Sequence, residues 1–234
     1  MRRVRRVVTS RPGGASTAPY DSLNLADHVG DDAAAVGVNR RRLAQGIGVD
    51  PSRLTWMRQV HGDEVTIVES TPPAEVPTCD ALVTAIPGTA LAVLVADCVP
   101  VLLADVHAGV IGAAHAGREG IRRHVVTRAL EAMVQLGASR ERVDVLLGPA
   151  ICGRCYEVSQ DLVDQVESAA PGGATRTRKG APGLDLRAAL AVEFGRLGVA
   201  QVVSDPRCTV EDPALFSYRR DKVTGRQAGV VWIA

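Results

Sequence analysis

The segment from residue 90 to residue 115 carries three apolar runs, broken only at Asp97-Cys98-Val99-Pro100 and at Val106-His107-Ala108-Gly109. Polar residues do not alternate with apolar ones inside these runs, so each strand is predicted to be buried on both faces. We expect a meander of antiparallel strands that is covered by further layers. Only 3% of the residues are aromatic although 46% are hydrophobic, so the core must be built from Val, Leu, Ile and Ala.

Helical spacing and further strands flank this segment. Helices are predicted from an Asp31 or Asp32 cap to residue 47, over 120–136, from about residue 159, and over 186–197. Strands are predicted up to residue 8, over 54–60 and 64–68 around the turn at residues 61–63, and over 143–147, 199–203 and 228–233, with a loop over 171–182. No linker divides the chain, so we expect one domain over residues 1–234. Helices interleaved with antiparallel strands predict an α+β layered sandwich.

Charge and composition exclude several classes of function. The net charge is +1, which gives no reason to expect a nucleic-acid or membrane partner. No stretch reaches the roughly 18 apolar residues of a membrane span. The N-terminal arginines precede Arg11-Pro12-Gly13-Gly14 rather than an apolar run, so we expect no signal peptide. Five cysteines, an odd number, then predict reduced thiols and a cytoplasmic location.

Two histidines and one cysteine end apolar runs next to Gly, Pro or Ala-Gly. They are His61, Cys98 and His115. Side chains at strand ends can point into a cleft, and three such ligands would leave the open fourth position of a catalytic zinc. The spacings of 98 − 61 = 37 and 115 − 98 = 17 residues are not those of a zinc finger or ribbon. Ordinary hydrogen-bonded histidines and a small buried cysteine are therefore the competing interpretation.

Arg118 lies at the predicted start of the helix that follows His115. Free backbone N–H groups and a guanidinium at this position suit a phosphate or carboxylate. In the alternative interpretation, Arg118 is solvated or pairs with Glu119.

The Cys152-Gly153-Arg154-Cys155 segment is a Cys-x-x-Cys motif. It would suit a redox pair or half of a metal knuckle. No second such pair exists to complete four ligands, since Cys79 and Cys208 are isolated in the sequence. The three other histidines are predicted to lie in a loop (His28), in a turn (His107) and on a helix surface (His124).

The ordered motifs together resemble a known family, once called domain of unknown function 152 and also described as laccase-like multicopper polyphenol oxidases, purine nucleoside phosphorylases or peptidoglycan editing factors. The matching segments run nearly end to end: Arg11-Pro12-Gly13-Gly14, Pro19-Tyr20-Asp21-Ser22-Leu23-Asn24-Leu25, His28-Val29-Gly30-Asp31, Asn39-Arg40, Gln59-Val60-His61-Gly62, Cys79-Asp80-Ala81-Leu82-Val83-Thr84, Ala96-Asp97-Cys98-Val99-Pro100-Val101, Ala114-His115-Ala116-Gly117-Arg118, Gly148-Pro149-Ala150-Ile151, Tyr156-Glu157-Val158 and Phe216-Ser217-Tyr218-Arg219-Arg220-Asp221.

The resemblance implies a layered α/β/β/α sandwich with mixed, mainly antiparallel sheets, like the catalytic domain of cytotoxic necrotizing factor. It implies that His61, Cys98 and His115 are catalytic zinc ligands and that Arg40 lies near the same cleft. Arg40 and Arg118 would bind substrate. The expected partners are a small-molecule nucleoside and phosphate, and the oligomeric state, monomer or homodimer, stays open.

The resemblance also implies an activity: phosphorolysis of adenosine, inosine and methylthioadenosine, with adenosine deaminase side activity. One alternative is an amidase that edits peptidoglycan precursors, either through zinc or with Cys98 as nucleophile and His115 as its base. Another is laccase, but a multicopper oxidase needs about ten histidines and the chain has five, so copper would be an adventitious substitute for zinc. A binding module without turnover is the non-enzyme alternative.

Overall fold

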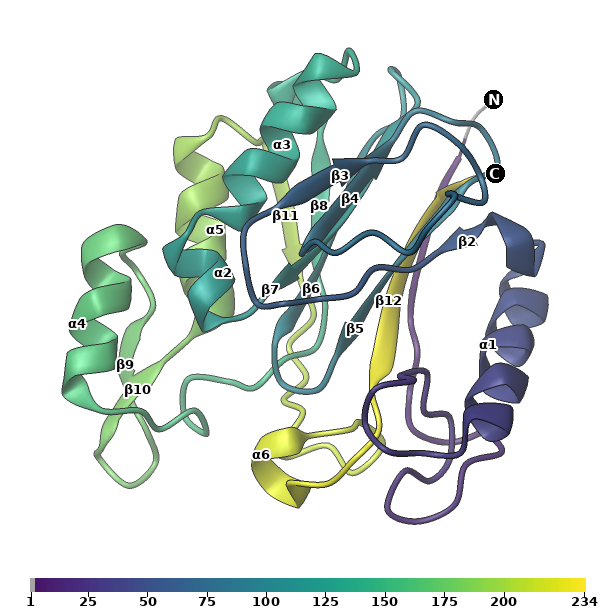
Figure 1. The fold of residues 1–234 in the computed structure, drawn as a ribbon. Helices are drawn as coiled ribbons and strands as arrows, with labels where there is room; N and C mark the ends of the chain where they lie inside the picture. The colour runs from purple at the N-terminus through teal and green to yellow at the C-terminus, as the bar shows by residue number, and fades with distance from the viewer. Residues whose placement is uncertain (1–2) are drawn as a thin grey trace.

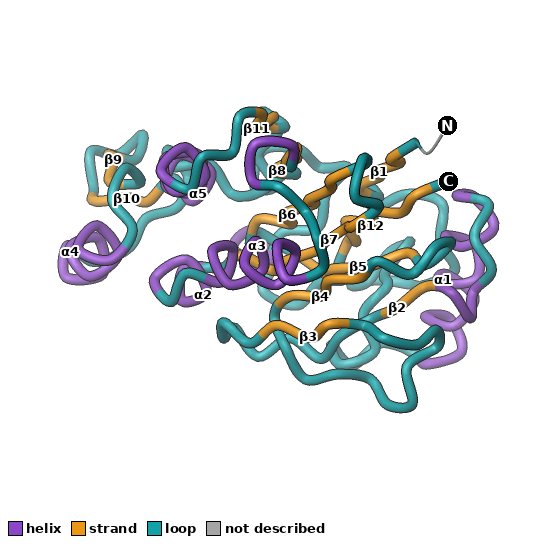
Figure 2. The backbone as a smooth tube through the Cα atoms, turned by 90° about the horizontal axis from the view of Figure 1, so that it is seen from above, coloured by secondary structure: helices purple, strands orange, loops and turns teal. Residues whose placement is uncertain are grey.

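The computed structural model describes residues 3–234 and has two β-sheets packed face to face between layers of helices (Figures 1 and 2). The four-stranded sheet has the order β1 (Val4–Val8), β12 (Gln227–Ile233), β5 (Ala90–Val95), β2 (Leu54–Thr55). The six-stranded sheet has the order β11 (Gln201–Ser204), β8 (Asp144–Leu147), β6 (Val99–Asp105), β7 (Val110–Ala116), β4 (Ala81–Thr84), β3 (Val65–Ile67).

Helix α1 covers the outer face of the four-stranded sheet, and the other long helices lie beyond the six-stranded sheet (Figure 2). The helices are α1 (Ala33–Ile47), α2 (Arg118–Arg122), α3 (Val125–Gln135), α4 (Gln160–Ala169), α5 (Leu186–Arg196) and α6 (Tyr218–Asp221), with 3-10 turns at Pro51–Arg53 and Arg140–Arg142. A hairpin of β9 (Ala174–Arg176) and β10 (Pro182–Leu184) lies beside α4. The predicted α+β class and the layered α/β/β/α order are confirmed.

Both sheets are mixed and mainly antiparallel, as predicted. The pairs β2–β5, β3–β4 and β8–β11 are parallel, and the other pairs within the two sheets are antiparallel. None of the helices in the described part of the chain combines the length and the apolar character needed to cross a bilayer.

The position of strand β5 between two apolar layers explains why its sequence does not alternate polar and apolar residues. Leu91, Val93 and Val95 face the six-stranded sheet, whereas Ala90, Ala92 and Leu94 pack toward α1. Successive side chains of a strand point to opposite faces, so a strand covered on both sides needs apolar residues at every position. The predicted burial of both faces is confirmed.

The predicted meander over residues 90–115 is only partly right. β6 and β7 form an antiparallel hairpin, but β5 belongs to the other sheet, where it pairs with β12 and β2. The chain changes sheet between β5 and β6, at Asp97, whose φ is 95°. The apolar pattern gives no sign of this change of sheet, because runs buried on both faces look alike in either sheet.

Several predicted boundaries also change. The helix over 120–136 is two helices, because His124 has a φ of 62° and stands at the start of α3. The strands over 54–60 and 64–68 shorten to β2 and β3, which lie in different sheets. The loop over 171–182 contains β9 and the start of β10. The N-terminal strand begins at Val4, and residues 1–2 lie outside the described residues.

Candidate metal centre and its pocket

The three predicted ligands come together at the edge where the two sheets meet. His61 follows β2, Cys98 lies between β5 and β6, and His115 is near the end of β7, beside Pro100 of β6. The ligand atoms of the three side chains all lie within 4.8 Å of one another. The two imidazole rings are 4.6 Å apart between centroids and are inclined by 73°. Residues separated by up to 54 positions in the chain thus form one cluster, as the sequence predicted.

A fully buried carboxylate, that of Asp80, holds two of these ligands in place. It accepts backbone N–H bonds from Val60 (3.1 Å), His61 (3.0 Å) and Gly62 (2.7 Å). His61 has a φ of 59°, and these bonds offset the cost of that backbone conformation. Asp80 Oδ1 also lies 2.8 Å from His115 Nδ1. An ionised carboxylate only accepts hydrogen bonds, so Nδ1 carries the proton and Nε2 is left to bind a metal.

A second carboxylate, that of Asp97, fixes the turn that carries Cys98. It accepts bonds from the hydroxyls of Thr209 (2.6 Å) and Ser217 (2.7 Å) and from the backbone N–H of Arg219 (2.6 Å). Asp97 is itself in the left-handed region. Each of the two strained turns at the centre is therefore held by a carboxylate that accepts several hydrogen bonds.

The surroundings of the cluster shift the pKa values of Cys98 and His115 in opposite directions. Burial opposes ionisation of the Cys98 thiol, but the charge and hydrogen bonds of His115 and His61 outweigh it and lower the Cys98 pKa to about 6. Burial disfavours the charged His115 imidazole, but the Cys98 thiolate and Asp80 outweigh it and raise the His115 pKa to about 9. Thiolate is the form of cysteine that binds metals, so Cys98 is already in its ligand form at neutral pH, whereas a metal that binds here must displace the Nε2 proton of the protonated His115 ring.

Gly117 leaves the space that a metal ion at this cluster requires. A Cβ atom at this position would lie 3.0 Å from Cys98 Sγ and 3.1 Å from His61 Nδ1. The backbone there, with φ −82° and ψ 174°, is open to any residue. The glycine is therefore needed for room beside the ligand atoms. Two imidazoles, a thiolate and this gap fit a zinc ion with an open fourth position.

The Gly117→Ala variant should lower zinc affinity at least tenfold, or about 1.4 kcal/mol, because the new methyl group displaces Cys98 Sγ or His61 Nδ1. Competition against a chromophoric chelator measures the affinity. The matched control is Gly46→Ala, since a Cβ at Gly46 meets no atom within 4 Å. Equal zinc affinity in both variants would contradict this placement of the metal.

A pocket of about 530 Å³ opens onto the three ligands, which is a size that small-molecule sites commonly have. Its lining combines the cluster with aromatic and cationic side chains. The cations are Arg219, Lys222 and Arg226. Arg219 stacks on the Tyr156 ring at 4.9 Å, and Arg226 lies 5.9 Å from the ring of Tyr218. Stacking restrains these side chains, so the pocket offers restrained positive charge to an anion.

The predicted substrate-binding arginines lie around this pocket rather than in its lining. Arg40 lines a neighbouring pocket of about 760 Å³, which shares His28 and Gln59 with the first one. Its guanidinium stacks on Trp56 at 4.4 Å, and its Nη2 is 3.2 Å from a carboxylate oxygen of Asp27.

Arg118 is not among the residues that line either pocket. Its Nε donates to Glu119 at 3.3 Å, the pairing that the alternative interpretation named. Helix α2 is only five residues long. The roles of Arg40 and Arg118 in binding substrate stay predictions.

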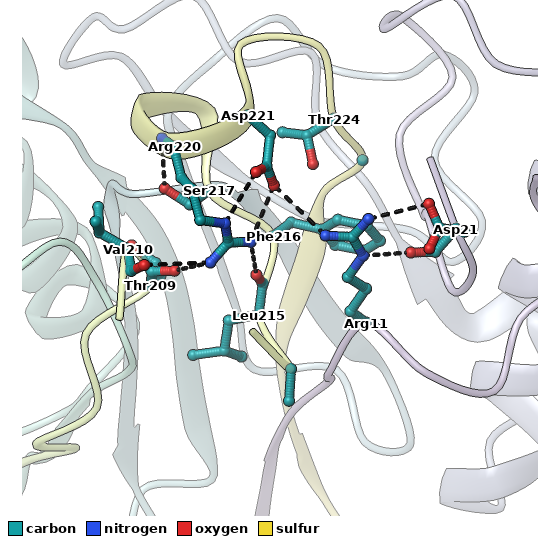
Figure 3. Close-up of polar contacts among 12 residues, drawn as sticks. Arg11, Asp21, Thr209, Val210, Leu215, Phe216, Ser217, Arg220, Asp221 and Thr224 are labelled. Atoms are coloured by element: carbon teal, nitrogen blue, oxygen red, sulfur yellow. Dashed lines mark hydrogen bonds and ion pairs between the residues drawn. The ribbon is translucent and has the colours of Figure 1, made fainter. Parts of the chain in front are cut away.

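A network around Arg220 positions α6, which supplies one wall of the pocket (Figure 3). The Arg220 guanidinium donates to the carbonyls of Thr209 (2.8 Å) and Leu215 (2.7 Å) and pairs with Asp221 at 2.9 Å. Arg11 reaches Asp221 from the N-terminal segment at 3.5 Å. The loop before α6, the helix itself and the start of the chain are thereby fixed to one another.

Sequence reasoning missed the residues that support the site. Asp80 could have been found as a lone carboxylate directly before a fully buried strand, β4, where an ionised group requires several donors. Arg226 carried no local signal. Cys152 and Cys155 lie outside the pocket lining. Burial and the neighbouring Glu211 raise the pKa of the Cys155 thiol, the reverse of what a redox-active thiol needs.

Comparison with known proteins decides the family. The sequence model of the family described as multi-copper polyphenol oxidoreductase laccase matches residues 5–234. The chain belongs to this family. Among curated relatives of this laccase-like chain, a Mycobacterium bovis protein named purine nucleoside phosphorylase is 54% identical, covering 99% of this chain and 92% of the relative. A Corynebacterium glutamicum protein of the same name is 52% identical, covering 99% and 95%.

Solved structures of the family have the same fold. A Neisseria meningitidis protein described under domain of unknown function 152 matches with a TM-score of 0.89 and 34% identity, covering 98% of this chain and 94% of that one. The YlmD protein of Geobacillus stearothermophilus matches with a TM-score of 0.91 and 32% identity, covering 98% and 91%. The laccase-like chain thus shares its whole architecture with these proteins.

Proposed function

We propose that this chain is a zinc-dependent purine nucleoside phosphorylase that acts on adenosine, inosine and methylthioadenosine, with adenosine deaminase as a side activity. The relatives named purine nucleoside phosphorylase support an enzyme with small-molecule substrates. The observation that carries the proposal is the pocket itself, in which a His₂Cys cluster faces three cationic side chains.

His61, Cys98 and His115 would hold the zinc, with Asp80 orienting His115. A zinc ion bound by three protein ligands supplies Lewis-acid chemistry at its open position. The space beside Gly117 and the low pKa of Cys98 both support this ligand set. Copper would occupy the same ligands only as a substitute.

The walls of the pocket suit the two substrates of phosphorolysis. Tyr156 and Tyr218 offer aromatic surface to a purine, and Arg219, Lys222 and Arg226 offer charge to phosphate. Phosphate oxygen forms the new bond to C1′ of the ribose, the bond from C1′ to the purine nitrogen breaks, and that nitrogen takes a proton. The residues of the chain would align the anion with C1′ and exclude water that would compete with it.

A product assay tests the proposal directly. Purified protein is mixed with adenosine, with and without phosphate, and adenine and inosine are followed by chromatography. Adenine that appears only with phosphate supports phosphorolysis, and inosine in both mixtures reports the deaminase activity. If neither product forms and a nucleotide-linked muropeptide is hydrolysed instead, the phosphorylase proposal is wrong and the amidase alternative holds.

Replacing Arg40 tests whether the neighbouring pocket takes part in anion binding. Arg40→Ala should raise the phosphate KM or lower kcat at least tenfold, which corresponds to about 1.4 kcal/mol of transition-state stabilisation. Arg41→Ala is the matched control, because Arg41 is exposed on the same helix. Arg118→Ala should have a smaller effect, since its guanidinium is paired with Glu119. Wild-type kinetics for Arg40→Ala with a loss in Arg226→Ala would place the anion on the α6 side only.

A further inference from the structure

Three cysteines and one glutamate lie together outside the pocket described above. The ligand atoms of Cys152, Cys155, Cys208 and Glu211 all lie within 4.8 Å of one another. The two halves of this group are 56 residues apart in the sequence. A parallel bridge between Ala150 and Cys208 brings them side by side. The Cys-x-x-Cys motif, which lacked a second pair in the sequence, therefore has one in space.

The two halves have the same local backbone structure. The carbonyl of Cys152 accepts hydrogen bonds from the N–H groups three and four residues later, at 2.9 and 3.0 Å. The carbonyl of Cys208 accepts from the N–H groups three and four residues later, at 3.1 and 2.9 Å. Each half is thus a single tight turn with a ligand-type residue at both ends, Cys-x-x-Cys in one and Cys-x-x-Glu in the other.

Two contacts join the two turns directly. Cys155 Sγ lies 3.2 Å from Glu211 Oε1, and the backbone N–H of Cys152 donates to Cys208 Sγ at 3.3 Å. An N–H bond to sulfur supports a ligating thiolate from outside the ligand shell. Arg178 pairs with the Glu211 carboxylate and so orients it in the way that outer partners orient a ligating carboxylate.

We propose that Cys152, Cys155, Cys208 and Glu211 bind a second zinc ion, which is structural. In a tetrahedral site with zinc–sulfur bonds of about 2.3 Å, ligand atoms are about 3.8 Å apart, so the observed cluster needs to contract only slightly. Four protein ligands close the coordination shell, as in structural zinc sites. A redox pair would use Cys152 and Cys155 and would give no role to Cys208 and Glu211, which face them.

The second zinc would fasten one wall of the pocket. Ile151 and Tyr156 flank the first turn and both line the pocket. Thr209, in the second turn, donates to the Asp97 carboxylate that fixes the turn carrying Cys98. An ion that joins the two turns would therefore restrain these residues of the pocket wall without contacting the substrate.

Metal counts on purified protein test this site independently of the proposed function. Wild-type protein should carry about two zinc ions per chain, Cys98→Ala and Cys155→Ser about one each, and Cys98→Ala/Cys155→Ser none. Cobalt bound to Cys98→Ala should show thiolate charge-transfer absorption, and this absorption should be lost in the double variant. Glu211→Gln, which keeps the size of the side chain and removes the charge of a proposed ligand, should lower the affinity of the remaining site in Cys98→Ala at least tenfold.

Two results would overturn the second site. One is Cys98→Ala protein that folds and carries no zinc. The other is wild-type protein, purified under reducing conditions, whose mass is lower by two hydrogens because Cys152 and Cys155 are joined. Failure of the first site instead would appear as a single zinc that is retained in Cys98→Ala and lost in Cys155→Ser.

Discussion

Cys98→Ala is expected to abolish turnover and to remove the zinc held by His61, Cys98 and His115, while the chain still folds. The thiolate is one of the three proposed ligands of that ion, and its pKa of about 6 keeps it ionised at neutral pH. The three hydrophobic clusters between the layers do not depend on the ion, so the fold has its own source of stability. Metal analysis, the product assay and far-ultraviolet circular dichroism measure the three outcomes.

His107→Ala is the matched control for Cys98→Ala, because His107 is exposed in the turn between β6 and β7 and does not line the pocket. It should keep wild-type metal content and turnover. A Cys98→Ala protein that is unfolded would show that this zinc is structural and that the catalytic assignment is wrong. A folded Cys98→Ala protein with full activity would remove the cluster from the mechanism altogether.

Asp80→Asn is expected to lower the free energy of unfolding by about 1–3 kcal/mol and zinc affinity by about 10- to 100-fold. Four donors converge on the two oxygens of Asp80, those of Val60, His61, Gly62 and His115. An asparagine offers one oxygen and turns its amide hydrogens toward the remaining donors. Urea unfolding and zinc titration measure the two effects.

Asp63→Asn is the control for Asp80→Asn, because Asp63 lies next to the backbone N–H groups that Asp80 binds but pairs with side chains of Arg128 and Arg123. Pairs of this surface type contribute roughly 0–1 kcal/mol. Equal destabilisation in the two variants would mean that Asp80 has no special role in the turn.

The stability that Asp80 contributes should depend on pH. Burial opposes ionisation of Asp80, but the His115 ring and the backbone N–H groups outweigh it and lower its pKa below the ordinary value. A lowered pKa in the folded state gives stability that is complete above the unfolded value of about 4 and is lost as the pH falls through the folded value. The difference in unfolding free energy between wild type and Asp80→Asn should therefore shrink below about pH 4. A constant difference across this range would contradict the assignment.

Helices and strands whose limits are set by nearby residues were predicted from the sequence. Helix α1 begins after the Asp32 cap and ends at Gly48, whose φ of 69° favours glycine, and both limits were predicted from the sequence. The hairpin strand β9 was missed because its three residues are mostly exposed and show no apolar pattern. Which strands pair with β5 could not be predicted, because a run buried on both faces has the same sequence in either sheet.

The ligands of the site were more predictable than their supports. His61, Cys98 and His115 each end an apolar run, so they were expected at one edge, and the structure brings them together. Their supports depend on long-range contacts: Asp97 is held by residues more than 110 positions away. The charges of the pocket likewise come from α6 and the start of β12, near the C-terminal end of the chain.

The chain crosses from one sheet to the other at two of the candidate ligands, so the cluster and the pocket walls are held by different parts of the structure. His61 and Cys98 both lie on segments that leave the four-stranded sheet and enter the six-stranded one, so the packing of the two sheets sets the spacing of the ligands. The aromatic and cationic walls come instead from residues 151–156 and 218–226, which are called the rim here. Rim residues can change in size or charge while the sheets stay packed as they are. Substitutions at the rim can therefore alter the shape and charge of the pocket while the spacing of His61, Cys98 and His115 stays the same.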